Sequence, residues 1–92
     1  MGLDIIETFM AVEAEFGVSV PDAEAGRMRT VGALFDYVRA HAPAAPAAGV
    51  EPRTPYAGPL WERYVDVIQR EAGVERGAVR PEAYWVEDLG LD

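Results

Sequence analysis

Residues 3–41 read LDIIETFMAVEAEFGVSVPDAEAGRMRTVGALFDYVRAH, and they carry much of the pattern from which the fold is predicted. Its first part carries apolar residues at helical spacing on one face, namely Ile5, Phe9, Val12 and Phe16, with Ile6 and Met10 widening the stripe. Gly17 favours a helix end, because glycine adopts the left-handed conformation without strain. The pattern predicts an amphipathic helix over residues 3–16.

A second helix is predicted further along the same stretch. Pro21 forces the residue before it to be extended, and Asp22 is typical of a cap for a brief helical turn through Ala25. Thr30 suits the N-cap of the next helix. The apolar residues of that helix share one face, and they are Val31, Leu34, Phe35 and Val38.

Helical periodicity returns near the C-terminus. Pro59 suits a first helical position, and Gly73 suits a helix end. The apolar face between them comprises Leu60, Tyr64, Val67 and Ile68, with Trp61 and Val65 beside it. Residues 74–92, VERGAVRPEAYWVEDLGLD, are typical of a loop, with anchors predicted at Val79, Tyr84, Trp85 and Leu89. Since no alternating strand pattern of useful length occurs, we expect an all-α fold with three principal helices and one or two short ones.

Residues 42–59 separate the two periodic parts and read APAAPAAGVEPRTPYAGP. Proline breaks helices and favours the extended polyproline conformation, so this segment is predicted to be a semi-rigid linker. The alternative is an ordered loop that packs on the domain through Val50 or Tyr56. The chain is therefore interpreted as one domain made of residues 1–41, a linker of residues 42–59, and residues 60–92.

Composition excludes several classes of function. The 92 residues include 16 Asp and Glu against 8 Arg, which gives a net charge of −8 and argues against nucleic-acid binding. The absence of cysteine excludes disulfides and thiol nucleophiles, and the single His41 cannot build a His-rich metal site. No apolar run approaches the roughly 20 residues of a membrane span, and no signal peptide is recognised. We expect an acidic cytoplasmic protein that does not bind membranes.

Residues 3–41 resemble the second half of an acyl carrier protein. The matching positions are Leu3, Asp4, Glu7, Glu13, Phe16, Gly17, Pro21 and Asp22, followed by Thr30-Val31-Gly32. Residues 60–92 resemble the first half of the same family, with Gly73-Val74 ending its opening helix and Asp88-Leu89-Gly90-x-Asp92 at its close. Because the halves stand in inverted order, the resemblance implies a small, circularly permuted, acyl-carrier-like helical bundle.

The inverted order places the cut at the family's phosphopantetheine-attachment motif, Asp-Ser-Leu. Asp92 and Leu3 supply the flanks of this motif, and Gly2 stands at the position of the serine. The resemblance therefore implies that this chain carries no 4′-phosphopantetheine, the cofactor of the family. Ser19 is the only serine, and its neighbours Val18 and Val20 differ from the motif, so we do not expect it to be modified. Thr8 lies inside the first predicted helix and is interpreted as a solvated or backbone-bonded residue.

Carboxylates gather at both ends of the chain. If the ends meet, Glu87, Asp88 and Asp92 lie near Asp4 and Glu7. Their spacing matches no recognised calcium loop, and no histidine or lysine stands nearby to complete a nucleophilic pair. We interpret them as solvated acidic surface, with weak Mg²⁺ or Ca²⁺ binding as the alternative, and predict no catalytic and no metal residues. His41 is expected to interact with the C-terminus of its helix.

The resemblance also implies a partner-binding surface. In the family the helix that corresponds to residues 3–16 is recognised by basic patches on partner enzymes, and here it carries Asp4, Glu7, Glu13 and Glu15. The alternative is an ordinary solvated helix face. The aromatic residues are interpreted first as core and second as an acyl-binding cleft, and they are Phe9, Phe16, Phe35, Tyr64 and Trp85.

Two functions remain open from the sequence. The first is a docking or scaffold module of fatty-acid, polyketide or nonribosomal peptide biosynthesis that lacks the prosthetic arm. The second is a genuine acyl or peptidyl carrier, or a fragment of tandem carriers, whose serine lies outside this chain. An extended linker of about 17 residues reaches roughly 50 Å, which exceeds the roughly 30 Å diameter of such a domain. Both a closed monomer and a domain-swapped homodimer are therefore possible.

Overall fold

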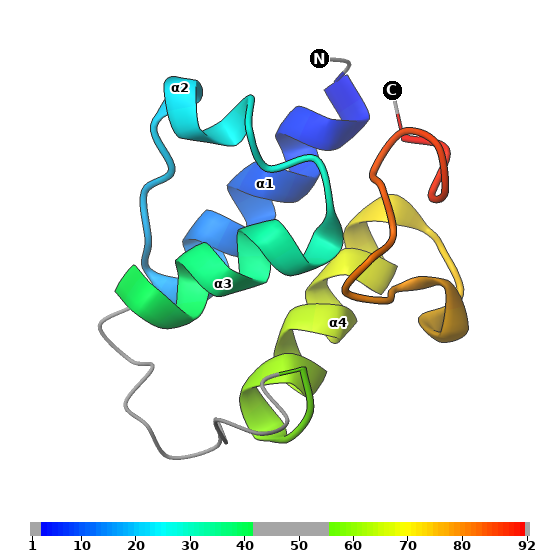
Figure 1. The fold of residues 1–92 in the computed structure, drawn as a ribbon. Helices are drawn as coiled ribbons and strands as arrows, with labels where there is room; N and C mark the ends of the chain where they lie inside the picture. Colours follow the sequence, from blue (N-terminus) through cyan, green and yellow to red (C-terminus); the bar gives the residue numbers. More distant parts are fainter. Residues whose placement is uncertain (1–2, 42–55, 92) are drawn as a thin grey trace.

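The computed structural model describes residues 3–41 and 56–91 as helices joined by loops (Figure 1). In chain order the elements are α1 (Leu3–Phe16), α2 (Asp22–Ala25), α3 (Val31–His41), α4 (Pro59–Ala72) and the 3-10 turn η1 (Arg76–Ala78). Within these two ranges, extended pairing is limited to one isolated antiparallel bridge between Thr30 and Tyr84. The predicted all-α fold is confirmed. None of the helices described in these ranges has both the length and the apolar character needed to cross a bilayer.

Helix α1 buries one narrow face. The expected core residues Ile5, Phe9, Val12 and Phe16 are all buried. Ile6 and Met10 are 39% and 61% exposed, so the predicted widening of the stripe is wrong. Both side chains border the space between α1 and α2, where the short helix does not cover them. Thr8 is fully buried, which also corrects the solvated interpretation of that residue. The helix ends as predicted, with Gly17 at a φ of 66°.

Helix α2 begins one residue earlier than the capping pattern implies. Its N-cap is Pro21, whose carbonyl oxygen accepts hydrogen bonds from the N–H groups of Glu24 and Ala25, both at 2.9 Å. Asp22 is thus the first helical residue and makes no capping hydrogen bond, so its predicted role as the cap is wrong. The Asp22 carboxylate in the first turn still interacts favourably with the partial positive charge at the N-terminus of this short helix.

The predictions for the two ends of helix α3 are confirmed. The Thr30 hydroxyl oxygen accepts a hydrogen bond from the Ala33 N–H at 3.2 Å, which is the geometry of an N-cap. At the other end His41 Nδ1 donates to the Tyr37 carbonyl oxygen at 3.0 Å. The predicted apolar face is buried, and it comprises Val31, Leu34, Phe35 and Val38.

Helix α4 joins the second part of the chain to the first. It begins with Pro59 at a first helical position and ends at Gly73, whose φ is 68°. Its buried residues are those predicted, namely Leu60, Trp61, Tyr64, Val65, Val67 and Ile68. Helix α4 packs on α1, and the Tyr64 ring lies 6.4 Å from the ring of Phe16. At the edge of this contact Arg63 Nε lies 2.6 Å from Glu15 Oε2.

An aromatic cluster centres on Phe35. Its ring lies 5.0 Å from the rings of Trp61 and Tyr64, and 5.9 Å from that of Tyr56. The Tyr56 hydroxyl donates to Asp36 Oδ1 at 3.0 Å. Because Tyr56 belongs to the Pro-rich segment, the end of that segment packs on the core, as the alternative to a plain linker anticipated. Val50, the other anchor of that alternative, lies outside the described residues.

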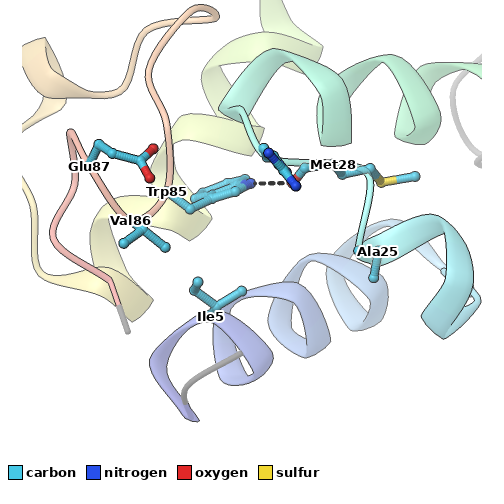
Figure 2. Close-up of a pocket in the computed structure, with 8 residues that line it drawn as sticks. Ile5, Ala25, Met28, Trp85, Val86 and Glu87 are labelled. Atoms are coloured by element: carbon cyan, nitrogen blue, oxygen red, sulfur yellow. Dashed lines mark hydrogen bonds between the residues drawn. The ribbon is translucent and has the colours of Figure 1, made fainter.

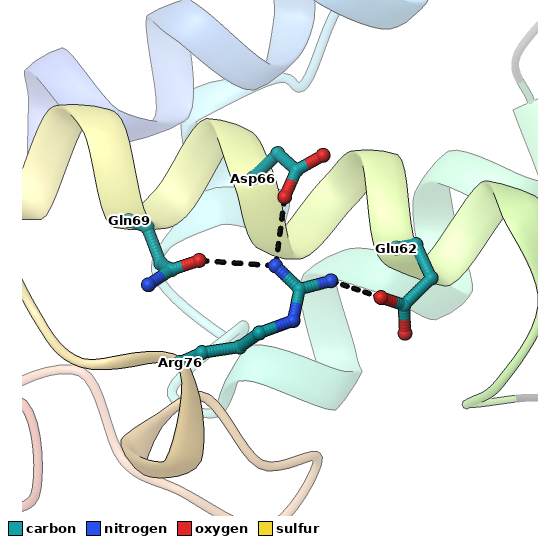
Figure 3. A network of polar contacts seen from close by, with 4 residues as sticks. All are labelled: Glu62, Asp66, Gln69 and Arg76. Atoms are coloured by element: carbon teal, nitrogen blue, oxygen red, sulfur yellow. Dashed lines mark hydrogen bonds and ion pairs between the residues drawn. The ribbon is translucent and has the colours of Figure 1, made fainter.

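Residues 74–91 form a C-terminal segment that lies against α4 through Arg76. The guanidinium of Arg76 donates to Asp66 at 2.7 Å, to Gln69 at 3.0 Å and to Glu62 (Figure 3). All three acceptors stand on one exposed face of α4. These three contacts of Arg76 hold η1 against α4.

Successive side chains near residue 84 of the C-terminal segment alternate between buried and exposed. Val79, Trp85 and Leu89 are buried as predicted, whereas Tyr84 is 45% exposed, so its predicted role as an anchor is wrong. Ala83, on the other side of the bridge residue, is fully buried. Successive side chains of an extended chain point to opposite faces, so Ala83 and Trp85 turn inward and Tyr84 turns outward.

The C-terminal segment also closes the N-terminal end of α3. The N–H groups of Val31 and Gly32 donate to the carbonyl oxygens of Ala83 and Pro81, both at 2.9 Å. These N–H groups have no acceptor within their own helix, so the C-terminal segment satisfies them. The two parts of the chain therefore share one core.

Candidate functional site

A cavity of about 230 Å³ lies between the start of α1, the connection from α2 to α3, and the C-terminal segment (Figure 2). Its floor consists of the buried side chains of Ile5, Met28 and Trp85. Its rim is more exposed and comprises Ala25, Gly26, Arg29, Val86 and Glu87. The cavity thus combines an apolar interior with two opposite charges at its mouth, which suits a small molecule or group with an apolar body.

Trp85 connects the C-terminal segment to the chain between α2 and α3 at this cavity. Its indole Nε1 donates to the Met28 carbonyl oxygen at 2.9 Å (Figure 2). Its backbone N–H donates to the Arg29 carbonyl oxygen at 3.1 Å. The ring of Phe9 meets the indole edge-on, with the centroids 5.5 Å apart. Two hydrogen bonds and an aromatic contact therefore set the position of the indole.

The sequence predicts only part of this cavity. Trp85 and Phe9 are expected as core aromatics, with a cleft as the second interpretation, and both are buried. Met28 and Arg29 are not singled out, because residues 26–30 show no periodicity. They meet Trp85 through hydrogen bonds between residues 56 or more positions apart in the chain. Nothing local in the sequence indicates those pairings.

The predicted attachment position lies at the start of α1. Leu3 opens the helix, while Gly2 and Asp92 lie outside the described residues. Covalent attachment of phosphopantetheine needs a hydroxyl group, and residues 3–7 contain none. Thr8 is fully buried, and Ser19 lies beyond the opposite end of the helix, where its carbonyl oxygen accepts a hydrogen bond from the Tyr37 hydroxyl. Residues 3–7 therefore offer no side chain for such an attachment, and the absence of the family's cofactor stays a prediction.

The predicted acidic surface of α1 is partly engaged within the chain. Glu7 is exposed. Glu13 Oε2 accepts a hydrogen bond from the Val20 N–H at 2.7 Å, and Glu15 pairs with Arg63. Asp4 lies in the first turn of α1, and its side chain is outside the described part of the structure. Partner binding by these four residues stays a prediction, with Glu7 the most available of those described.

The C-terminal carboxylates have separate surroundings. Glu87 stands at the rim of the cavity, while Asp88 Oδ2 accepts a hydrogen bond from the Tyr84 N–H at 2.8 Å. Asp88 thereby closes a turn of its own segment. Across residues 3–41 and 56–91, no three His, Cys, Asp or Glu side chains come together as metal ligands would.

Titratable groups with shifted pKa values lie away from the cavity lining. The Tyr64 hydroxyl donates to the Val31 carbonyl oxygen at 2.6 Å, and burial, with a smaller contribution from Asp36, raises the pKa of Tyr64 well above 10.0. Burial and the hydrogen bond to Asp36 also raise the pKa of Tyr56. Hydrogen bonds to Asp66 and Glu62 raise the pKa of Arg76. None of these three groups lines the cavity, so their pKa shifts belong to the packing of the fold.

A second groove, of about 190 Å³, lies between α1 and α2. Its apolar lining combines residues of α1 and the neighbouring loop and short helix, namely Ile6, Phe9, Met10, Val20 and Ala25. Glu13 and Asp22 add carboxylates to the same groove. An apolar groove with acidic edges is a surface that a protein carrying basic residues around an apolar anchor can recognise.

Comparison with known proteins finds a partial match to an acyl carrier protein. No family model matches the chain, and no solved structure matches it. An acyl carrier protein from Clostridium acetobutylicum is 46% identical over 39 residues, which cover 42% of this chain and 51% of that protein. The chain thus spans about half the length of the curated relative that it matches. The helical fold is compatible with an acyl-carrier-like bundle, and the partial match makes this chain similar to acyl carrier proteins over part of its length.

Proposed function

We propose that this chain is an acyl-carrier-like module whose two halves stand in circularly permuted order, and that it docks to enzymes without carrying phosphopantetheine. The observation that carries the proposal is the cavity shared by Ile5 of α1 and residues 85–87 of the C-terminal segment. In this arrangement the end of the C-terminal segment lies beside the start of α1 (Figure 1). The same arrangement is expected if residues 60–92 precede residues 3–41 in the family's order.

The proposed partners are enzymes of fatty-acid, polyketide or nonribosomal peptide biosynthesis that present basic patches. Exposed Glu7 and a net charge of −8 favour encounter with such surfaces. The neighbouring groove with Ile6 and Met10 offers apolar contact once the two surfaces meet. A role in binding and not in chemistry is supported by the match to a carrier protein.

The Gly2→Ser variant tests the permuted arrangement. If Asp92 and Leu3 flank residue 2 in space, a serine there restores the family's attachment motif. The variant and the unaltered chain are incubated with coenzyme A and a promiscuous phosphopantetheinyl transferase, and their intact masses are measured. We expect one added phosphopantetheine on residue 2 of the variant and none on the unaltered chain.

The control for this experiment is the double variant Gly2→Ser/Ser19→Ala, which should be modified to the same extent as Gly2→Ser. Modification of the unaltered chain would contradict the proposal that it carries no prosthetic arm. An unmodified Gly2→Ser variant that remains folded by circular dichroism would contradict the permuted arrangement.

A second candidate function is a genuine carrier whose attachment serine lies outside this chain. The cavity favours it, because an apolar space beside the start of α1 can shelter an apolar group held at that end. A reading frame that continues after Asp92 with a serine codon would support this candidate. A stop codon there would contradict its tandem form.

The proposed oligomeric state is either a closed monomer or a domain-swapped homodimer, in which the contact between α1 and α4 forms within one chain or between two chains. A mass near 10 kDa by light scattering would support the monomer, and a mass near twice that value would favour the domain-swapped dimer.

A further inference from the structure

We propose that Arg76 is a clasp that fastens η1 to α4, and that a basic partner opens this clasp by taking over the carboxylates that Arg76 binds. The inference rests on the proposed function only in taking the partners to carry basic patches. It concerns the exposed face of α4, and neither the groove between α1 and α2 nor the cavity beside Trp85 takes part in it.

The clasp is a single guanidinium that reaches three acceptors on α4 (Figure 3). Arg76 Nη1 donates to Asp66 Oδ1 at 2.7 Å and to Gln69 Oε1 at 3.0 Å, while Nη2 donates to Glu62 Oε1. Positions 62, 66 and 69 lie on one helix face because they are three or four residues apart. A guanidinium suits this arrangement because its donors form a planar fork that binds several oxygen atoms at once.

Other contacts hold η1 only loosely. None of its three residues, Arg76–Ala78, is buried, and Ala78 is only partly covered by the core. The Ala78 N–H donates to the carbonyl oxygen of Glu75 at 3.0 Å, so this hydrogen bond stays within the turn and does not reach α4. The attachment of η1 to α4 therefore depends largely on the side chain of Arg76.

The chain that follows η1 is held much more firmly. Val79, Ala83 and Trp85 are buried, and the Ala83 carbonyl oxygen accepts the Val31 N–H at 2.9 Å. Parts of a protein with few buried contacts open locally while the core stays folded. We therefore expect η1 to open separately from the C-terminal residues that close α3.

Competing cations can reach the clasp because its members face the solvent. The side chains of Arg76, Glu62 and Asp66 are 43%, 57% and 65% exposed. Ion pairs at this exposure are weak and are screened by salt. Glu62 and Asp66 stand four residues apart on one helix, so they repel each other unless a cation lies between them. A cation supplied by a partner therefore replaces Arg76 at little cost.

Hydrogen exchange of backbone amides in ¹H–¹⁵N spectra of the intact chain tests the salt dependence of the clasp. Raising NaCl from about 20 mM to about 1 M should speed exchange of the Ala78 amide by about three- to tenfold, because exposed ion pairs are screened. The Val31 amide, which is bonded to the firmly held part, should change by less than about 1.5-fold over the same range.

Arg76→Gln should give the same faster exchange of the Ala78 amide already at low salt, and further salt should then have little effect. The matched control is Arg70→Gln, which makes the same change in charge on α4 but breaks only a contact with the adjacent Glu71. Its Ala78 exchange should keep the salt dependence of the unaltered chain. Arg76→Lys keeps the charge without the fork and should lie between the unaltered chain and Arg76→Gln.

A short acetylated oligo-arginine peptide tests opening by a basic partner. We expect it to speed exchange of the Ala78 amide several-fold more than NaCl of equal ionic strength does. A peptide with citrulline in place of arginine has the same shape without the charge, and it should have no effect. The double variant Glu62→Gln/Asp66→Asn should abolish the response to the oligo-arginine peptide.

Any of three results would overturn the inference. They are salt-independent exchange of the Ala78 amide in the unaltered chain, the same exchange in Arg76→Gln as in Arg70→Gln, or a response to oligo-arginine that persists in Glu62→Gln/Asp66→Asn. Circular dichroism confirms that each variant is folded before exchange is measured. The modification test on residue 2 does not involve α4, so its failure is distinguishable from these results.

Discussion

The N–H of Gly32 donates a hydrogen bond to the carbonyl oxygen of Pro81 at 2.9 Å, and a Cβ atom on Gly32 would lie 2.8 Å from that same oxygen. The two residues belong to α3 and to the C-terminal segment, and they meet where α3 begins. A close backbone approach of this kind requires glycine, although the position lies in a helix, where glycine is otherwise unfavourable.

Gly32→Ala should therefore destabilise the protein, although alanine is the better helix former. We expect a loss of about 1–3 kcal/mol in the free energy of unfolding, because the added methyl group must push Pro81 away and break its hydrogen bond. Urea unfolding measures this loss. The control is Gly77→Ala, where no atom lies within 4 Å of the added Cβ, and its effect should stay within about 0.5 kcal/mol. Equal stability of the two variants would contradict the steric argument.

Removal of the Thr30 cap should weaken the start of α3. Thr30→Ala loses the oxygen that accepts the Ala33 N–H, and we expect a loss of about 1 kcal/mol in the free energy of unfolding. Thr30→Ser keeps the hydroxyl and should recover most of this stability. If serine is no better than alanine in urea unfolding, the methyl group of Thr30 and not its hydroxyl carries the stabilisation.

Stability should fall in alkaline solution because of Tyr64. Burial raises the pKa of Tyr64 well above 10.0, so the folded chain keeps its proton after the unfolded chain begins to lose it. Below pH 10 both states are protonated and this group contributes no pH dependence. Above pH 10 the unfolded state binds fewer protons, and the free energy of unfolding declines by up to about 1.4 kcal/mol per pH unit.

Tyr64→Phe should remove this alkaline dependence. The variant also loses the hydrogen bond to the Val31 carbonyl oxygen, which lowers stability by about 1 kcal/mol near neutral pH. Urea unfolding between pH 8 and 11 measures both effects. Tyr56→Phe is the comparison, since the pKa of Tyr56 is also raised but its side chain is only partly buried. Because the raised pKa of Tyr56 contributes a slope of the same sign, only an undiminished slope above pH 10 in Tyr64→Phe would contradict the role of Tyr64.

Charge reversal at Glu7 should slow docking to basic partners. Modification of Gly2→Ser by a phosphopantetheinyl transferase provides the readout, and Gly2→Ser/Glu7→Lys should react several-fold more slowly at low salt. The difference should shrink as ionic strength rises. Gly2→Ser/Glu75→Lys makes the same change in net charge on the segment after α4 and should react at nearly the rate of Gly2→Ser. Equal rates for the two lysine variants would contradict a specific role for Glu7.

The helices of this protein could be predicted from its sequence because their ends depend on neighbouring residues. Gly17 and Gly73 adopt left-handed conformations, Thr30 caps the third helix, and Pro59 opens the fourth. Each of these effects acts within about four residues, as does the periodicity that selects a buried face. The predictions that Ile6, Met10 and Tyr84 are buried were wrong. Local patterns do not show which side of a helix or loop the rest of the chain covers.

The amino-acid sequence was enough to predict an acidic, all-α chain, its helix ends, its main core faces and its resemblance to acyl carrier proteins. Three contacts became visible only in the folded chain: Trp85 bonds to Met28, Gly32 meets Pro81, and Glu15 pairs with Arg63. These contacts join residues that are far apart along the chain. Contacts between residues about 50 positions apart form only when packing of the whole core brings their backbones together, and no local pattern encodes that meeting.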